Sequence, residues 1–373
     1  MTCFKCTLST LALVAAMTMP LRAQTAPVTV DSSGTVTVKE LAVPLSSNMS
    51  EEARKAFLDM AQKPFQPEWM NPDSQIDILR ALDEADLKPV VAKARARYDV
   101  KIVDRQIGNV STREVTPAAG VTGSKRKRVL IELHGGGFFT GAGGQALLES
   151  VPLAALGGYK IIAVDYRQGP EHRYPAATDD VLTVYRALLR EYAPRDIGIY
   201  GCSAGGSLTA MAIATIAQQG LPRPGAIGIL SASAFAGFLE PPAAVGAWGG
   251  DSRFTAPVLG GEPPQSLGNE PPPFPKVALR YLEGVDLSGP LVSPGNHPDV
   301  LAKFPPTLVL TGTRGFDMSA AIQTHRNLLK AGATAQLNIW DGMGHCFFSD
   351  PDLPESKEAF TVMAKFFDRW LTH

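Results

Sequence analysis

The sequence feature that most constrains the fold is the hexapeptide Gly201-Cys202-Ser203-Ala204-Gly205-Gly206. It follows the apolar run Ile197–Tyr200 and opens a stretch rich in Ala, Leu, Met and Ile, which predicts a strand, a sharp turn and a helix. Gly-x-Ser-x-Gly in that context is typical of a nucleophile elbow, the turn that exposes a reactive serine. Because the pattern fixes only three positions, its meaning depends on the rest of the chain.

A second glycine-rich motif, His134-Gly135-Gly136-Gly137, follows a predicted buried strand upstream of the serine. Successive glycines let backbone N–H groups approach an oxygen that gains negative charge during ester cleavage. A phosphate-binding loop is the alternative interpretation, but no Gly-Lys-Ser/Thr follows, and a histidine before the glycines is not a feature of such loops. The motif therefore favours an oxyanion-binding loop.

A carboxylate and a histidine follow the serine in the chain order expected for an α/β-hydrolase. Asp317 lies just past a predicted buried strand, and His345 lies after the next one, among glycines. Both positions fall at the carboxyl edge of a predicted parallel sheet, where Ser203 also lies. Of six histidines, His345 is the one placed in this way, whereas His325 falls within a predicted helix and His373 is the last residue.

These motifs resemble the hormone-sensitive-lipase family of α/β-hydrolases, the carboxylesterases marked by His-Gly-Gly-Gly. The resemblance covers nearly everything after about residue 40 and extends to Asp165-Tyr166-Arg167 and to the segments 170–177, 289–294 and 342–347. It implies an α/β fold with a mainly parallel central sheet, helices on both faces and a small cap.

The same resemblance implies the roles of the site residues. Ser203 is then the nucleophile, His345 the general base and afterwards the acid, and Asp317 the carboxylate that orients the imidazole. The resemblance also implies an oxyanion hole and a reaction without cofactor or metal. The oxyanion hole would be formed by the N–H groups of Gly136, Gly137 and Ala204.

The chain departs from the family pattern at two places. Asp317-Met318-Ser319-Ala320-Ala321 stands where the family commonly has Asp-Pro-Leu-x-Asp, so Asp317 is the only carboxylate there. Cys202 stands at the acidic position of the usual Gly-Asp-Ser-Ala-Gly elbow, and Cys346 follows the candidate histidine. If the serine and the histidine meet, these neighbours come within disulfide range. A similar pairing is a feature of the tannase and feruloyl-esterase group, so we predict a Cys202–Cys346 disulfide, with two buried free thiols as the alternative.

Residues 1–23 predict a secretory signal peptide. Lys5 precedes the uncharged segment 6–21, and Leu21-Arg22-Ala23 is an imperfect small-residue cleavage site. An uncleaved membrane anchor is the alternative, although the uncharged segment is short for a span. Two of the four cysteines, Cys3 and Cys6, lie in this segment and would be removed with it. Export to the periplasm or the medium would place the other two, Cys202 and Cys346, in an oxidising compartment.

The remaining chain divides into a predicted leader with cap helices over residues 24–98 and a hydrolase domain over 99–373. Helices are expected over Ser50–Ala61 and Ser74–Lys93. A Pro- and Gly-rich cap insertion is expected over about 235–290. Four of its aromatic residues either line a substrate pocket or only anchor the cap: Phe235, Phe238, Trp248 and Phe254.

Composition limits the partners. With 35 basic and 36 acidic residues the net charge is −1, which argues against nucleic-acid binding. The basic run Lys125–Arg128 is expected at a solvated hairpin tip. The expected substrate is a small-molecule ester with a short- to medium-chain or small aromatic acyl group, and no stable membrane insertion is expected. Amidase or lactonase activity stays open, as does a catalytically silent receptor, which typically lacks a triad member.

Overall fold

The computed structural model describes residues 28–32, 36–38, 42–62, 75–236 and 280–371. The chain divides into two compact units, 1–44 and 45–373. In the first unit, β1 (Val28–Val30) and β2 (Val36–Val38) pair in antiparallel orientation. The predicted signal peptide, most of the predicted cap insertion and the aromatic residues Phe238, Trp248 and Phe254 lie outside the described residues.

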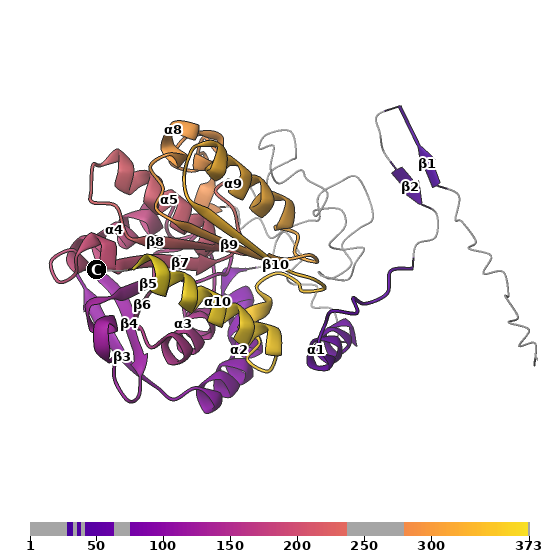
Figure 1. The fold of residues 1–373 in the computed structure, drawn as a ribbon, viewed down its shortest axis with the longest axis horizontal. Helices are drawn as coiled ribbons and strands as arrows, with labels where there is room; N and C mark the ends of the chain where they lie inside the picture. Colours follow the sequence, from indigo (N-terminus) through magenta and orange to yellow (C-terminus); the bar gives the residue numbers. More distant parts are fainter. Residues whose placement is uncertain (1–27, 33–35, 39–41, 63–74, 237–279, 372–373) are drawn as a thin grey trace, which may run out of the picture. The chain divides into compact units, whose positions relative to one another are not determined.

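An eight-stranded sheet forms the centre of the second unit (Figure 1). The strand order is β10-β9-β8-β7-β5-β6-β4-β3. The six strands β5 to β10 run parallel, whereas β4 pairs in antiparallel orientation with both β6 and β3. The mainly parallel sheet expected from the sequence is therefore confirmed. Its strands are β3 (Val100–Ile107), β4 (Val110–Pro117), β5 (Val129–Leu133), β6 (Lys160–Val164), β7 (Ile197–Cys202), β8 (Ala226–Leu230), β9 (Thr307–Gly312) and β10 (Ala335–Trp340).

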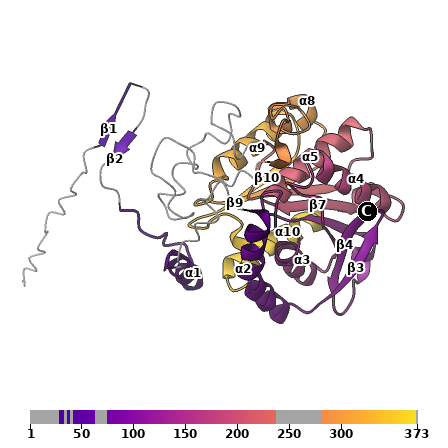
Figure 2. The same ribbon diagram turned by 180° about the vertical axis from the view of Figure 1, so that it is seen from behind.

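Helices cover both faces of this sheet (Figures 1 and 2). The helices α2, α3 and α10 lie on one face, and α4, α5, α8 and α9 lie on the other. Within the described ranges, the α-helices of this unit are α1 (Glu51–Gln62), α2 (Ile76–Arg97), α3 (Gly144–Gly157), α4 (Ala176–Leu188), α5 (Ala204–Gln218), α8 (Pro298–Leu301), α9 (Met318–Lys330) and α10 (Pro354–Trp370).

Alternation along the strands explains the two layers. Ile131 of β5 packs into the apolar cluster with α4 and α5, whereas its neighbour Leu130 packs into the cluster with α3 and α10. Successive side chains of a strand point to opposite faces, so a strand covered on both faces is mostly apolar. All five residues of β5 are buried, and four of them are apolar, the exception being Glu132.

The expectation of a hairpin tip at Lys125–Arg128 is wrong, whereas its solvation is confirmed for Arg126 and Lys127, which are exposed. The run lies in and just after the 3₁₀ helix η2 (Gly123–Lys127), which connects β4 to β5, and these strands are not neighbours in the sheet. Lys125 and the nearly buried Arg128 pair with Asp368 of α10 at 2.9 and 3.2 Å. A cation carried into the packed face needs such a partner, because burying an unpaired charge is costly.

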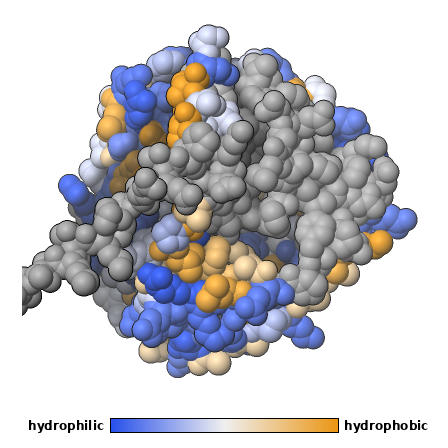
Figure 3. All heavy atoms as spheres, turned by 90° about the vertical axis from the view of Figure 1, so that its right-hand side faces the viewer, coloured by the Kyte–Doolittle hydropathy of each residue, from blue (hydrophilic) through white to orange (hydrophobic). Residues whose placement is uncertain are grey.

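Among the described residues, no helix is both long enough and apolar enough to cross a bilayer. On the face drawn in Figure 3, a group of apolar side chains lies beside hydrophilic ones. Large apolar side chains are exposed in this unit, for example Leu58 of α1 and Ile78 of α2. Exposed apolar atoms are common on folded proteins and need no special explanation when scattered.

Candidate active site

The turn between β7 and α5 has the strained backbone of a nucleophile elbow. Ser203 has φ +56° and ψ −122°, a conformation that non-glycine residues rarely adopt. A Cβ atom at Gly201 would lie 2.1 Å from the carbonyl oxygen of Leu133, and one at Gly205 only 1.7 Å from it. Glycine is therefore needed at both positions, because only then can β7 and α5 pack closely against the end of β5. This close packing holds Ser203 at the tip of the turn in its strained conformation.

The glycine-rich loop after β5 lies directly against this turn. A Cβ atom built on Gly135 would stand 3.4 Å from the Cβ of Ser203. Gly136 and Gly137 have φ +105° and +60°, values that suit glycine, and the Gly136 carbonyl accepts the N–H groups of Phe139 and Thr140 at 3.0 Å. The loop is thus a tight turn with its backbone next to the serine, as an oxyanion-binding loop requires.

A buried carboxylate contacts the candidate base. Asp317 has no exposed surface, and its Oδ1 lies 2.8 Å from Nδ1 of His345. The Thr311 hydroxyl donates to Asp317 Oδ2 at 2.6 Å, and the Phe316 ring stacks on the imidazole at a centroid distance of 4.3 Å. With both carboxylate oxygens engaged and one ring face covered, the imidazole is held in one orientation.

The predicted disulfide is present. Cys202 and Cys346 are bonded, with a Cα–Cα distance of 6.4 Å. The backbone N–H of Cys346 also donates to the Ser231 hydroxyl at 3.0 Å, just beyond the end of β8. The residue before Ser203 and the residue after His345 are therefore covalently joined. The bond holds together the turn that carries the serine (residues 202–204, the serine turn) and the loop that carries the histidine (residues 341–346, the histidine loop).

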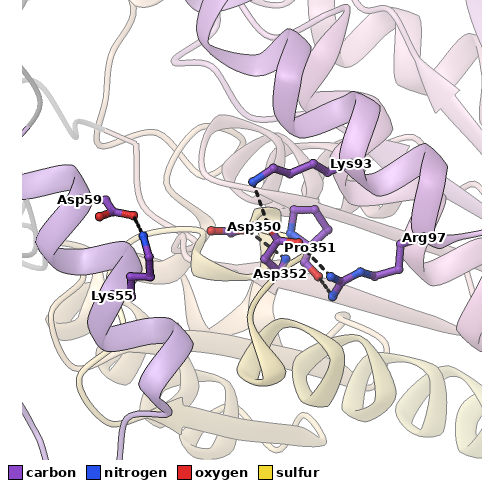
Figure 4. Close-up of polar contacts among 7 residues, drawn as sticks. All are labelled: Lys55, Asp59, Lys93, Arg97, Asp350, Pro351 and Asp352. Atoms are coloured by element: carbon purple, nitrogen blue, oxygen red, sulfur yellow. Dashed lines mark hydrogen bonds and ion pairs between the residues drawn. The ribbon is translucent and has the colours of Figure 1, made fainter.

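Helix α2 holds two loops of the site. Arg80 donates through Nε to the Phe139 carbonyl at 2.8 Å, and Asp83 accepts the Thr140 hydroxyl at 2.7 Å. Burial raises the pKa of Asp83. At the other end of α2, Lys93 and Arg97 bind Asp352, beyond the 3₁₀ helix η6 (Phe347–Ser349) that follows the histidine (Figure 4).

Helix α2 was predicted as part of a cap over the site. In the structure it packs against α3 and belongs to the same compact unit as the sheet. Whether it also covers the substrate stays a prediction.

Three titratable groups are fully buried behind the glycine-rich loop: Glu132, His134 and Glu149. Burial lowers the pKa of His134 to about 4, so the ring is neutral at pH 7, and it stacks on Tyr166 at 4.2 Å. Burial raises the pKa of Glu132 well above its usual value and that of Glu149 to about 7. Sequence reasoning missed Glu149, although a lone glutamate in the apolar stretch 146–156 was the available signal.

Within the described part of the chain, no three His, Cys, Asp or Glu side chains gather in a way that could hold a metal ion. A carboxylate, an imidazole and a serine on loops after parallel strands, beside a glycine-rich turn, define an α/β-hydrolase. A family model described as the alpha/beta hydrolase fold matches residues 130–349. The chain belongs to that family, in its hormone-sensitive-lipase branch.

Curated and solved relatives agree with this assignment. The chain is 30% identical over 241 residues to an acetyl-hydrolase from Streptomyces hygroscopicus, a match that covers 64% of this chain and 75% of that protein. The structure resembles that of esterase E25 with a TM-score of 0.75 at 27% identity, covering 90% of this chain and 99% of the other. It also resembles an esterase from the bacterial hormone-sensitive lipase family with a TM-score of 0.68 at 25% identity, covering 87% and 99%. The protein is a carboxylic ester hydrolase.

Proposed function

We propose that this hydrolase cleaves small esters through an acyl-enzyme, with Ser203 as nucleophile, His345 as base and Asp317 as the orienting carboxylate. The observation that carries the proposal is the 2.8 Å contact between His345 Nδ1 and Asp317 Oδ1, on a loop that the disulfide joins to the serine turn. Because Nδ1 donates to the carboxylate, Nε2 is the ring nitrogen that accepts the serine proton.

The proposed reaction has two halves. Ser203 Oγ attacks the ester carbonyl while its proton moves to His345 Nε2, and the new oxyanion accepts the N–H groups of Gly136, Gly137 and Ala204. The imidazolium, stabilised by the buried Asp317, then gives the proton to the departing alkoxide. A water molecule deprotonated by the same imidazole hydrolyses the acyl-serine and restores the enzyme.

The amide groups of the oxyanion loop support this assignment. Among the described residues, the N–H groups of Gly136 and Gly137 meet no protein acceptor, whereas that of Gly135 is engaged by a carboxylate. Ala204 is the first residue of α5, so its N–H has no partner within the helix. Three backbone donors next to the serine are thus available to a negatively charged oxygen.

For the substrate we propose esters with short- to medium-chain or small aromatic acyl groups. The name of the acetyl-hydrolase relative supports the short end of this range. A panel of p-nitrophenyl acetate, butyrate, octanoate and palmitate with a methyl hydroxycinnamate ester measures it as kcat/KM. We expect the value to be highest for one of the esters up to octanoate or for the hydroxycinnamate, and a maximum at the long-chain palmitate would contradict the proposed range.

The catalytic assignment is tested by Ser203→Ala. We expect kcat to fall by about 10⁴-fold or more, because the nucleophile and its partner act as a unit. Ser207→Ala, one helical turn further along α5, is the matched control and should keep full activity. If Ser203→Ala kept more than about a hundredth of the wild-type kcat, the acyl-enzyme mechanism would be wrong.

We also propose that the mature enzyme is exported. The sequence of residues 1–23 and the pair of cysteines near the site support this, since disulfides persist in oxidising compartments. Mass spectrometry of the protein from periplasmic and medium fractions should find a chain that lacks the first 23 residues. Recovery of the intact chain from the cytoplasmic fraction alone would contradict export.

A further inference from the structure

The side chain of Glu149 links two segments of the site that are far apart in sequence. It lies on α3 and has no exposed surface. Its Oε1 accepts the backbone N–H of Gly135 at 3.1 Å. Gly135 belongs to the glycine-rich loop after β5, residues 135–137, which we call the oxyanion loop. Its Oε2 accepts the backbone N–H of Cys202 at 2.9 Å, directly before the nucleophile.

A third contact extends this link to the histidine loop. Gln145, one turn earlier on α3, donates through Nε2 both to Glu149 Oε1 at 3.1 Å and to the Ser349 hydroxyl at 3.0 Å. Ser349 lies in η6, four residues after His345. Glu149 and Gln145 therefore connect the oxyanion loop, the serine turn and the histidine loop from one face of one helix.

We propose that Glu149 is a positioning residue, whose carboxylate fixes the oxyanion loop against the serine turn by accepting one backbone N–H from each. The inference rests on the proposed function, because it concerns the alignment of Gly136 and Gly137 with the oxygen that Ser203 attack creates. A misplacement of about 1 Å in such a site can lower the rate by about 10²-fold.

The chemistry of the group explains why a carboxylate occupies this place. Above its pKa of about 7, the Glu149 carboxylate only accepts hydrogen bonds, and each of its oxygens can serve a separate donor. Glutamine has one acceptor oxygen, so its NH₂ group would face either the Gly135 or the Cys202 N–H. Burial of a carboxylate is costly unless such donors compensate it, so the arrangement is not a neutral way to fill space.

The neighbouring Glu132 provides a matched control. It is also fully buried, on β5, but within the described part of the chain neither of its carboxyl oxygens has a hydrogen-bond partner. Burial raises its pKa well above the usual value, which favours the neutral acid, and Glu132→Gln keeps the shape of the side chain without adding a charge. A second control, Tyr200→Phe, removes the 3.1 Å bond from the Tyr200 hydroxyl to the Glu149 backbone carbonyl and leaves the carboxylate intact.

The experiment compares Glu149→Gln, Glu132→Gln, Tyr200→Phe and the wild type on p-nitrophenyl acetate, with thermal unfolding measured for each. We expect Glu149→Gln to lower kcat by about 10- to 100-fold with KM changed by less than about threefold, and both controls to stay within about threefold of wild type. An alkyl trifluoromethyl ketone, which forms a tetrahedral oxyanion adduct with the serine, should bind more weakly to Glu149→Gln by a similar factor.

The inhibitor separates positioning from stability, because a folded enzyme with an intact oxyanion loop should bind it normally even if its melting temperature is lower. A folded Glu149→Gln enzyme with wild-type kcat and wild-type inhibitor affinity would overturn the inference. If Glu149→Gln does not fold, the variant Gln145→Leu, at a half-buried position, tests the inference instead. We expect its kcat to be about 3- to 10-fold lower and its inhibitor binding to be weaker. A wild-type kcat together with wild-type inhibitor affinity would overturn the inference. Should the wild type be inactive, or Ser203→Ala active, the proposed function fails instead.

Discussion

The disulfide near the active site should contribute about 5 kcal/mol to the free energy of unfolding. The bond between Cys202 and Cys346 closes a loop with a sequence separation of 144 residues. In the chain-entropy model, closure of a loop of this size removes about 17 cal/mol/K from the unfolded chain, or about 5 kcal/mol at 25 °C. Reduction of the bond, or the double variant Cys202→Ala/Cys346→Ala, should remove most of this contribution.

Urea denaturation of the protein lacking residues 1–23 measures the effect, with and without dithiothreitol, because these two cysteines are then the only ones in the chain. The double-alanine variant is the control and should not respond to the reductant. We also expect the reduced enzyme to lose activity at urea concentrations that leave the oxidised enzyme folded, since the bond joins the serine turn to the histidine loop. A stability difference below about 1 kcal/mol would refute the entropic argument. Alkylation of two thiols without reductant would refute the bond itself.

Three further outcomes follow from the site. Asp317→Asn should lower kcat by about 10⁴-fold at pH 7 with little change in KM, because the amide favours the wrong tautomer of His345; a loss below about tenfold in steady-state kinetics would contradict the orienting role. Gly205→Ala should prevent folding or cost several kcal/mol in urea denaturation, because its Cβ would lie 1.7 Å from a backbone carbonyl oxygen, whereas Gly143→Ala meets only a flexible glutamate and should be tolerated. Burial lowers the pKa of His134 from 6.5 to about 4, so between these values the folded state binds fewer protons than the unfolded state. About 3 kcal/mol of stability that is present above pH 6.5 is therefore lost as the pH falls to 4. Urea denaturation of wild type and His134→Gln between pH 7.5 and 4.5 checks this, and an equal change of the free energy of unfolding with pH in both proteins would contradict it.

Local patterns explain what the sequence could predict. The elbow and the glycine-rich loop are recognisable in the sequence because few residue types other than glycine fit their backbone. Examples are the positive φ of Gly136 and the close approach of another backbone segment at Gly205. The helix predicted over Ser50–Ala61 is observed as Glu51–Gln62, because a polar start and an amphipathic pattern are local signals. The same logic predicted the strands that carry the candidate acid and base.

Contacts between distant segments were less accessible. The run Lys125–Arg128 was misread as a hairpin tip because consecutive strands often pair, and nothing in the run itself indicates that Asp368 of α10 lies beside it. Similarly, the sequence of α2 does not indicate that Arg80 and Asp83 hold the loop after the glycines. Such partners are set by the packing of helices on the sheet, which a single sequence does not display.

The way in which the site is assembled explains why some of its features are predictable from the sequence and others are not. Its reacting groups lie on loops from separate strands, and such loops need links to keep their relative positions. The disulfide links the serine turn to the histidine loop, and the carboxylate of Glu149 links the same turn to the oxyanion loop. The histidine loop is linked in turn to Asp317, after β9. Only the covalent link has a sequence signature, a cysteine beside each reacting residue. A buried carboxylate on α3 differs from an ordinary helical glutamate only through its partners, so it emerges when the three loops are seen together.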